Sequence, residues 1–142
     1  MRPIYESDTD LCNEQSIVVA LESRFKCSFK KTPKFFSVDY VAVRENKPVA
    51  WVEIKCRKYT MLQIHSFGGY LISLKKIISA KHLFDVTGLP FILIVKAADE
   101  IYFSQFQTFS FTNLVIGGRK DRQDAEDVEP CVLIPTDSFR KL

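Results

Sequence analysis

Two apolar runs separated by a short polar break decide the fold of this chain. Residues 35–43 read Phe-Phe-Ser-Val-Asp-Tyr-Val-Ala-Val, residues 44–47 read Arg-Glu-Asn-Lys, and residues 48–56 read Pro-Val-Ala-Trp-Val-Glu-Ile-Lys-Cys. The flanks are rich in β-branched and aromatic residues, which favour strands, and the polar break is a turn signal. The stretch therefore predicts a β-hairpin with one carboxylate in each strand, at Asp39 and Glu53.

The register of this hairpin decides which charged side chains meet. Side chains alternate between the two faces of a strand, so Glu53 and Lys55 point to the same face. With a three-residue loop, Arg44 pairs with Pro48 and Asp39 lies directly opposite Glu53. A two-residue loop would shift the register by one and send Asp39 to the other face.

Opposed carboxylates at Asp39 and Glu53 would form a candidate metal site. Mg²⁺ and Mn²⁺ favour oxygen ligands and typically take one or two carboxylates together with waters and substrate phosphate. The backbone carbonyl of Ile54 lies between Glu53 and Lys55 and would add a third oxygen. Lys55 would orient the attacking water or neutralise charge that develops on the phosphate. The set predicts metal-dependent hydrolysis of a phosphodiester.

The same charges also have an ordinary structural explanation. The solvated face of an antiparallel hairpin often carries salt-bridged pairs. We favour a functional site because Asp39 and Glu53 fall inside apolar runs rather than at strand ends, and because Asp is disfavoured in strands.

The order of Asp39, a hairpin and then Glu53-Ile54-Lys55 resembles the motif of the PD-(D/E)XK phosphodiesterase superfamily, also called restriction-endonuclease-like. Ser37-Val38 stands where that family usually has a proline before the aspartate. A further acidic residue of the family often comes from the first helix, and Glu14 occupies the matching place. The resemblance therefore adds Glu14 to the catalytic candidates.

The resemblance covers most of the chain as an order of helix, hairpin, helix and further strands. It implies an α/β fold with a restriction-endonuclease-like core, in which helices flank a mixed β-sheet. It also implies a DNA endonuclease with Mg²⁺ or Mn²⁺ as cofactor, similar to small phage or resolvase-type nucleases, which often act as homodimers. Two other interpretations stay open: a non-catalytic nucleic-acid-binding or assembly module that kept the fold, and a metal-free structural protein whose hairpin charges simply pair.

Length and composition agree with a single domain over residues 1–142. The chain is 46% hydrophobic, which is enough to bury a core, and its net charge of +3 permits DNA as a partner. The four cysteines lack C-x-x-C spacing, which argues against a zinc site, and no apolar run approaches the length of a membrane helix. We therefore expect a cytoplasmic protein, in the host cytoplasm if it is viral, with reduced thiols and no membrane contact.

Apolar spacing predicts two helices. The first begins at the capping residues Asp8 to Asp10 and ends near Phe25. The second opens near Ser66, ends near Gly88 and would form a crossover to the next strand. Its apolar face consists of Phe67, Leu71, Leu74 and Ile78.

Three further strands are predicted. Residues 91–95 form a continuous apolar run suited to the centre of a sheet, and residues 101–106 follow after a turn. Residues 131–135 would form a last strand, held at a sheet edge by its proline. Gly117-Gly118 predicts a turn, and the mixed-charge segment 119–127 predicts a surface loop.

Basic residues on both sides of the motif are candidates for contact with a phosphate backbone. A solvated surface is the alternative interpretation for each of them. Lys76 should lie opposite the apolar face of the second helix, where DNA could also reach it. The substrate-binding candidates are Lys30, Lys31, Lys34, Arg57, Lys58 and Lys75.

Overall fold

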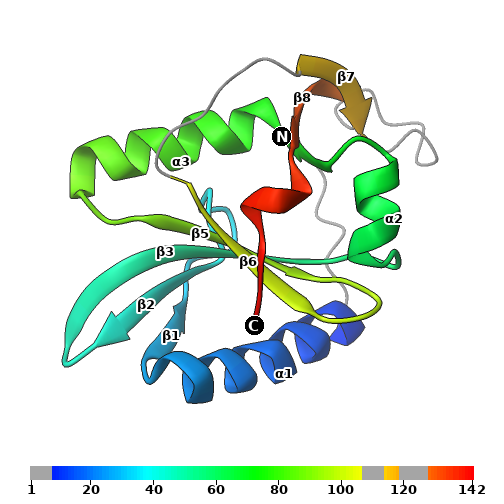
Figure 1. Cartoon of the computed structure of the whole chain (residues 1–142). Coiled ribbons are helices and arrows are strands. Elements are labelled where there is room, and N and C mark those ends of the chain that lie inside the picture. Colours follow the sequence, from blue (N-terminus) through cyan, green and yellow to red (C-terminus); the bar gives the residue numbers. More distant parts are fainter. Residues whose placement is uncertain (1–7, 107–113, 119–127) are drawn as a thin grey trace.

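The computed structural model describes residues 8–106, 114–118 and 128–142. Its main feature is a six-stranded sheet of order β1-β2-β3-β5-β6-β9 (Figure 1). Strands β3 and β5 are parallel, and the other neighbours are antiparallel. The strands are β1 (Ser28–Lys31), β2 (Tyr40–Arg44), β3 (Lys47–Cys56), β5 (Phe91–Lys96), β6 (Ile101–Phe106) and β9 (Arg140–Lys141).

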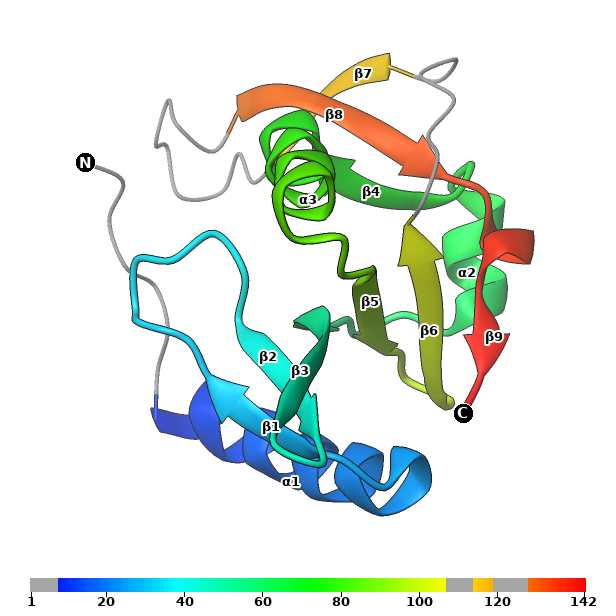
Figure 2. The same ribbon diagram turned by 90° about the vertical axis from the view of Figure 1, so that its left-hand side faces the viewer.

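Helices and a smaller sheet cover the two faces of the six-stranded sheet. Helix α1 lies along one face, and α3 and the smaller sheet, of order β4-β8-β7, lie on the other (Figures 1 and 2). The mixed sheet flanked by helices is therefore confirmed. The remaining elements are α1 (Asp8–Phe25), α2 (Met61–Ser66), β4 (Tyr70–Ser73), α3 (Leu74–Thr87), β7 (Leu114–Gly118), β8 (Val128–Ile134) and a 3₁₀ turn at Thr136–Ser138.

Alternation along β3 divides the core into two layers. Its even-numbered side chains from residue 50 to 54 pack with Ile17 and Leu21 of α1. Trp51 packs on the opposite side, against a cluster that includes Ile77 of α3. Because Glu53 is two residues from Trp51, it also points into the space between the sheet and α3.

The first predicted helix and the predicted central strand are confirmed. Helix α1 runs from Asp8 to Phe25, as its apolar spacing indicates. Strand β5 lies between β3 and β6, and α3 belongs to the crossover that joins β3 to β5. Phe91, Leu93 and Val95 of β5 are buried in the layer next to α3, and Ile94 is buried in the layer next to α1. Within the described residues, no helix is both long enough and apolar enough to cross a membrane.

The hairpin closes through a two-residue turn, so the predicted pairing of Arg44 with Pro48 is wrong. Arg44 pairs with Lys47 instead. The turn residues Glu45 and Asn46 have φ values of 52° and 63°. Two consecutive positive φ values are typical of a type I′ turn, whose twist matches that of the strands it joins.

A β-bulge restores the register that the two-residue turn would have lost. Val43 pairs with Pro48, whereas Ala42 pairs with Ala50, so Val49 is an extra residue in β3. Beyond the bulge the register continues to Tyr40, the first residue of β2, which pairs with Val52. This is the register that a three-residue loop also predicts, and Asp39, which directly precedes the strand, contacts the backbone N–H of Ile54 through its carboxylate.

The second predicted helix is wrong in its first half. Helix α2 ends at Ser66, and β4 occupies residues 70–73. The helical conformation ends before Gly68 and Gly69, whose φ values of 98° and 132° are costly for residues with a Cβ. A Cβ on Gly69 would lie 2.5 Å from the backbone oxygen of Ile134 in β8. The local conformation at these glycines therefore overrides the helical spacing of the apolar residues.

Helix α3 begins and ends at capping residues. The hydroxyl of Ser73 accepts a hydrogen bond of 3.1 Å from the backbone N–H of Lys75. Gly88 has a φ of 72° and closes the helix, which confirms the predicted end.

The last predicted strand belongs to β8, but its position at a sheet edge is wrong. Strand β8 lies between β4 and β7. Its pairing with β4 ends at Cys131, so at Pro130 the strand has a neighbour only on the β7 side, and the missing N–H is tolerated there. Pro135 directly follows the strand.

Two further predictions near the C-terminus have different outcomes. Gly117 and Gly118 are paired residues at the end of β7, not a turn. The predicted surface loop at 119–127 lies outside the described residues. Strand β9 was not predicted from the sequence.

Candidate active site

Asp39 lies in the loop immediately before β2, not inside a strand as predicted. Its Oδ2 accepts a hydrogen bond of 3.0 Å from the backbone N–H of Ile54. Thr32 fixes the adjoining backbone, because its N–H and its hydroxyl both donate to the carbonyl of Asp39, at 3.0 and 2.8 Å. The Asp39 carboxylate is thereby held beside the central residue of the Glu53-Ile54-Lys55 motif.

Glu53 is a buried carboxylate between two lysines. Its side chain is 1% exposed. Lys55 Nζ and Lys76 Nζ lie 3.3 and 3.2 Å from its Oε1. Lys76 was expected opposite the apolar face of its helix, and that expectation is wrong because the ammonium points into the site. A buried carboxylate is costly without partners, and the two lysines supply them.

The charges around Lys55 favour its ammonium form. Burial acts to lower the pKa of Lys55, but the carboxylates of Glu53 and Asp39 outweigh it and raise the pKa above its usual value. Tyr70, at the start of β4, is also buried close to this group. Burial raises the pKa of Tyr70, and the nearby charges of Arg57 and Lys55 only partly oppose this rise. Lys55 is therefore a fixed positive charge next to both carboxylates.

Glu14 reaches the site from α1, next to Lys31 and Tyr40. Lys31 Nζ lies 3.1 Å from Glu14 Oε2, and the Tyr40 hydroxyl donates to the same oxygen at 3.2 Å. Lys31 Nζ also lies 4.8 Å from the centre of the Tyr40 ring. Burial raises the pKa of Glu14, Asp39 adds to the rise, and Lys31 opposes it. Lys31, a predicted phosphate contact, is therefore engaged with an acidic residue of the site.

The site offers oxygen donors, and this donor set fits a hard divalent cation. In an extended strand the N–H and C=O of one residue point to the same edge, so the Ile54 carbonyl faces the same opening as the N–H that binds Asp39. Strand β2 begins opposite Val52 and leaves this edge open. Within the described residues, no three His, Cys, Asp or Glu side chains cluster closely enough to hold a metal. The candidate oxygen ligands stay those predicted from the sequence, namely the carboxylates of Asp39 and Glu53 and the carbonyl of Ile54.

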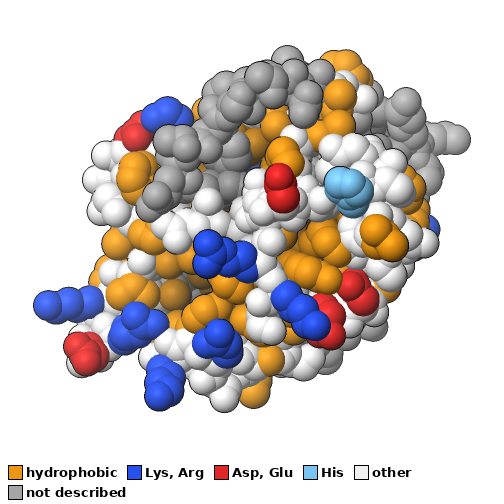
Figure 3. Space-filling view, in the orientation of Figure 1, with side chains coloured by type: hydrophobic (Ala, Val, Ile, Leu, Met, Phe, Trp, Pro, Cys, Tyr) orange, Lys and Arg blue, Asp and Glu red, His pale blue; other side chains and the backbone are white. Residues whose placement is uncertain are grey.

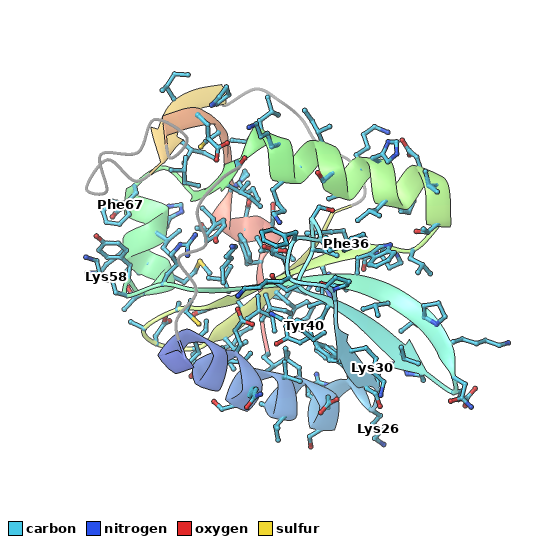
Figure 4. All side chains as sticks on the ribbon, turned by 180° about the vertical axis from the view of Figure 1, so that it is seen from behind. Lys26, Lys30, Phe36, Tyr40, Lys58 and Phe67 are labelled. Atoms are coloured by element: carbon cyan, nitrogen blue, oxygen red, sulfur yellow. The ribbon has the colours of Figure 1, made fainter. Side chains whose placement is uncertain are left out.

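The predicted substrate-binding residues occupy different parts of the surface. Lys30 and Lys34 are exposed on β1 and the loop after it, and Lys75 is exposed at the start of α3. Lys58 is exposed, with its Nζ 5.4 Å from the centre of the Tyr59 ring. Lys30 and Lys58 lie at opposite ends of the face in Figure 4. Arg57 lies 5.1 Å from the centre of the Tyr70 ring and so borders the site itself.

Two exposed aromatic side chains, Phe36 and Phe67, each lie close to another aromatic ring. Phe36, in the loop before Asp39, is 43% exposed, and its ring centre lies 5.8 Å from that of Trp51. Phe67 lies beside α2, with its ring centre 5.0 Å from that of Tyr59 (Figure 4). On the face shown in Figure 3, Lys and Arg side chains are spread over the half that holds the sheet and α1. Positive charge is therefore not confined to the surroundings of the motif.

Sequence reasoning identified the motif residues but missed Lys76, Tyr70 and Thr32. Tyr70 lies in the part of the predicted second helix that is in fact β4, and Lys76 was expected to point away from the apolar face of that helix. The Gly68-Gly69 pair, which is unusual within a helix, indicates in the sequence that the helix does not continue through this segment. Thr32 carries no local signal, because its partners depend on how the loop to Asp39 closes.

Comparison with known proteins gives a family for the chain. A family model described as "Phage putative PDDEXK endonuclease" matches residues 1–142. No curated protein sequence matches this chain. Among solved structures, it is similar to Hjc, a Holliday junction resolvase from the archaeal hyperthermophile Archaeoglobus fulgidus, with a TM-score of 0.48 and 16% sequence identity. That alignment covers 63% of this chain and 66% of the resolvase.

The family match extends over the hairpin motif and over the helix that carries Glu14. It confirms the resemblance to the PD-(D/E)XK superfamily and, with it, the restriction-endonuclease-like fold class. This chain belongs to the phage PDDEXK endonuclease family.

Proposed function

We propose that this protein is a metal-dependent endonuclease that hydrolyses phosphodiester bonds of DNA, as one nuclease domain over residues 1–142. The observation that carries the proposal is the contact of Asp39 with the backbone N–H of Ile54. This contact sets one carboxylate beside a second, buried one at Glu53 and next to the ammonium of Lys55. Family membership supports the nuclease activity, and the oxygen-rich donor set supports a hard metal ion.

Each residue of the site has a role in this proposal. Asp39, Glu53 and the carbonyl of Ile54 would hold Mg²⁺ or Mn²⁺. The bound cation would supply a Lewis acid for the phosphate and lower the pKa of the attacking water. Lys55, whose positive charge is secured by the two carboxylates, orients that water or stabilises charge on the phosphate. Glu14 would add a further acidic group on the α1 side of the site, where its charge and that of Asp39 repel each other.

The substrate would lie across the face that carries the exposed cations. Lys30, Lys34, Lys58 and Lys75 are exposed and available to phosphates, and Arg57 borders the site beside Tyr70. Lys31 would attract the phosphate backbone through its charge, and it would also hold Glu14 through an ion pair while it packs over the Tyr40 ring. The proposal includes a homodimer, which would bring two such sites to the two strands of DNA. It also includes a location in the host cytoplasm.

A cleavage assay tests the proposal. Purified protein is incubated with linear duplex, single-stranded, branched and flapped DNA in the presence of Mg²⁺ or Mn²⁺, with and without EDTA. We expect cleavage of at least one substrate with metal and none with EDTA, because the site has hard oxygen ligands. Cleavage that persists under chelation would rule out the metal mechanism.

Site variants separate the nuclease from its two alternatives. Asp39→Asn, Glu53→Gln and Lys55→Ala should each lower the cleavage rate by at least about a hundredfold while DNA binding persists. A metal-free structural protein would instead lose melting temperature, with any cleavage simply proportional to the folded fraction. A non-catalytic binding module would bind DNA and cleave none of the four substrates with either metal.

A further inference from the structure

Lys76 contacts a proposed metal ligand but has no role in the proposed nuclease mechanism. Its Nζ lies 3.2 Å from Oε1 and 3.3 Å from Oε2 of Glu53. The same ammonium donates to the backbone carbonyl of Ser37, in the loop that leads to Asp39. A lysine ammonium has three N–H donors and no acceptor, and these three oxygens match its donors. The ammonium therefore lies in an oxygen-lined position between Glu53 and the loop before Asp39.

Two cations share one buried carboxylate in this arrangement. Glu53 is 1% exposed, and Lys55 contacts the same Oε1 atom as Lys76, at 3.3 Å. Lys55 comes from the same strand as Glu53, whereas Lys76 comes from α3, across the core layer. Lys76 is the more enclosed of the two, with 24% of its side chain exposed against 40% for Lys55. Its contacts thus tie α3, β3 and the loop before Asp39 together through charge.

We propose that Lys76 is a tethered counter-ion that occupies the cation position at Glu53 when no metal is bound and competes with the divalent metal for that carboxylate. The inference rests on the proposed function, because it assumes that Glu53 is a metal ligand. Lys76 is then a positioning residue: in the metal-free protein it pairs with the Glu53 carboxylate and holds the loop before Asp39 in place. Its positive charge also opposes a second cation at the same oxygens.

Two opposite effects follow from removing the charge of Lys76. The metal-free protein should lose stability, because Glu53 keeps only Lys55 as a partner in a buried position. Metal affinity should rise, because the divalent cation no longer has to displace an ammonium group. A residue that only packs, or one that assists catalysis directly, would not produce this pair of changes.

The test is a Mn²⁺ titration by calorimetry on wild type, Lys76→Met, Lys81→Met and Glu53→Gln, without DNA. Methionine keeps the length and apolar stem of lysine. Lys81 is the matched control, because it lies in the same helix and forms a 3.0 Å ion pair with Asp85, but on the exposed surface. We expect Lys76→Met to bind Mn²⁺ about tenfold tighter than wild type or more, since hydrogen bonds to charged groups have that magnitude. Lys81→Met should match wild type, and Glu53→Gln should abolish binding.

Melting temperatures in EDTA supply the second half of the test. Lys76→Met should melt below Lys81→Met, and added Mn²⁺ should raise its melting temperature more than that of wild type. If Lys76→Met does not fold, lysine side-chain NMR of wild type replaces it. The Lys76 signal should then shift with Mg²⁺ at the affinity that calorimetry gives, while the Lys81 signal stays fixed.

The possible results separate this inference from the proposed function. Wild type that binds Mn²⁺ through Glu53, together with equal or weaker binding by Lys76→Met, would overturn the role of Lys76 and leave the nuclease proposal standing. A Lys76 signal that ignores Mg²⁺ in a protein that binds it would do the same. No binding by any variant would overturn both.

Discussion

Burial and charge act against each other at Glu14. Burial raises the pKa of Glu14 and Lys31 lowers it, with a net rise. A raised pKa in the folded state means that this carboxyl contributes most to stability below its unfolded pKa, and that the contribution is lost as pH rises through the folded value. At neutral pH the ionised form is therefore tolerated at a cost in stability, as is common for functional groups.

Glu14→Gln tests this cost directly. We expect the variant to melt at or above the temperature of wild type at pH 7, and the gain to fade as pH falls below the usual pKa of Glu. Cleavage should fall at the same time, if Glu14 belongs to the acidic cluster. Melting curves of both proteins between pH 3 and pH 8 give the sign of this difference. A variant that melts below wild type at pH 7 and approaches it at low pH would contradict the prediction.

Thr32 is predicted to act on Asp39 through the backbone. Thr32→Val removes the hydroxyl that donates to the carbonyls of Val38 and Asp39 and should cost about 1 kcal/mol of stability. Cleavage should fall further than the folded fraction does, because the Asp39 carboxylate loses its alignment with Ile54. Thr87→Val is the control, since that hydroxyl donates to Leu83 at 2.6 Å, at the far end of α3. Equal cleavage by the two variants would show that Thr32 has only a structural role.

The motif residues could be predicted because the information lies within the hairpin. Strand alternation alone puts Glu53 and Lys55 on one face, and both lie on the face toward α3 in the structure. Lys76 could not be predicted, because its contact with Glu53 spans 23 residues and depends on where α3 begins. An apolar pattern interrupted by two glycines did not define that starting point.

In the β2–β3 hairpin, the bulge compensates for the short turn. The predicted three-residue loop and the observed two-residue turn with an extra Val49 both pair Tyr40 with Val52, so the register before the bulge was predicted correctly from the wrong turn. The residue pairs far from the turn cannot distinguish a three-residue loop from a two-residue turn followed by a bulge. The positive φ values of Glu45 and Asn46 depend on the twist of the flanking strands, which sequence spacing does not contain.

Gly69 holds β4, and with it Tyr70, against β8. Gly69→Ala should destabilise the protein by at least about 2 kcal/mol, because the new Cβ meets backbone and the φ of 132° is strained for alanine. Gly88→Ala is the matched control: its φ is also positive, but a Cβ there has nothing within 4 Å, so about 1 kcal/mol is expected. Chemical denaturation measures both. Equal losses would mean that the contact with Ile134 is relieved by small shifts.

Electrostatic binding of DNA depends on exposed cations from several elements of the molecule. Lys30 and Lys34 are exposed near the motif, whereas Lys31 is engaged with Glu14, so only the first two are expected as simple phosphate contacts. Neutralising both should make the log–log salt slope of duplex binding shallower by about 1.8, or about 0.9 for each contact. Neutralising Lys81 and Lys141, which form exposed ion pairs with Asp85 and Glu100, should leave it unchanged. An unchanged slope for Lys30 and Lys34 would shift the binding face toward Arg57, Lys58 and Lys75.

The general architecture was predictable where a single element carries its own pattern. Helix α1, the hairpin strands, β5 and β6 follow from periodicity and apolar runs. The small sheet was not predictable, because β4 pairs with β8 across about sixty residues and neither strand has a strong pattern of its own. Pro130 lies in the part of β8 that pairs with β7 but extends beyond the pairing with β4, so a proline does not by itself predict that the whole strand lies at an edge.

The most direct test of the central proposal is a crystal structure of the protein soaked with Mn²⁺, with the metal located by its anomalous signal. We predict a peak bound by the carboxylates of Asp39 and Glu53 and by the Ile54 carbonyl, at about 2.0–2.2 Å from each oxygen. Lys76 should then no longer contact Glu53 as it does in the metal-free protein. A well-ordered site without an anomalous peak, at Mn²⁺ concentrations that support cleavage, would contradict the assignment of these residues as the metal centre.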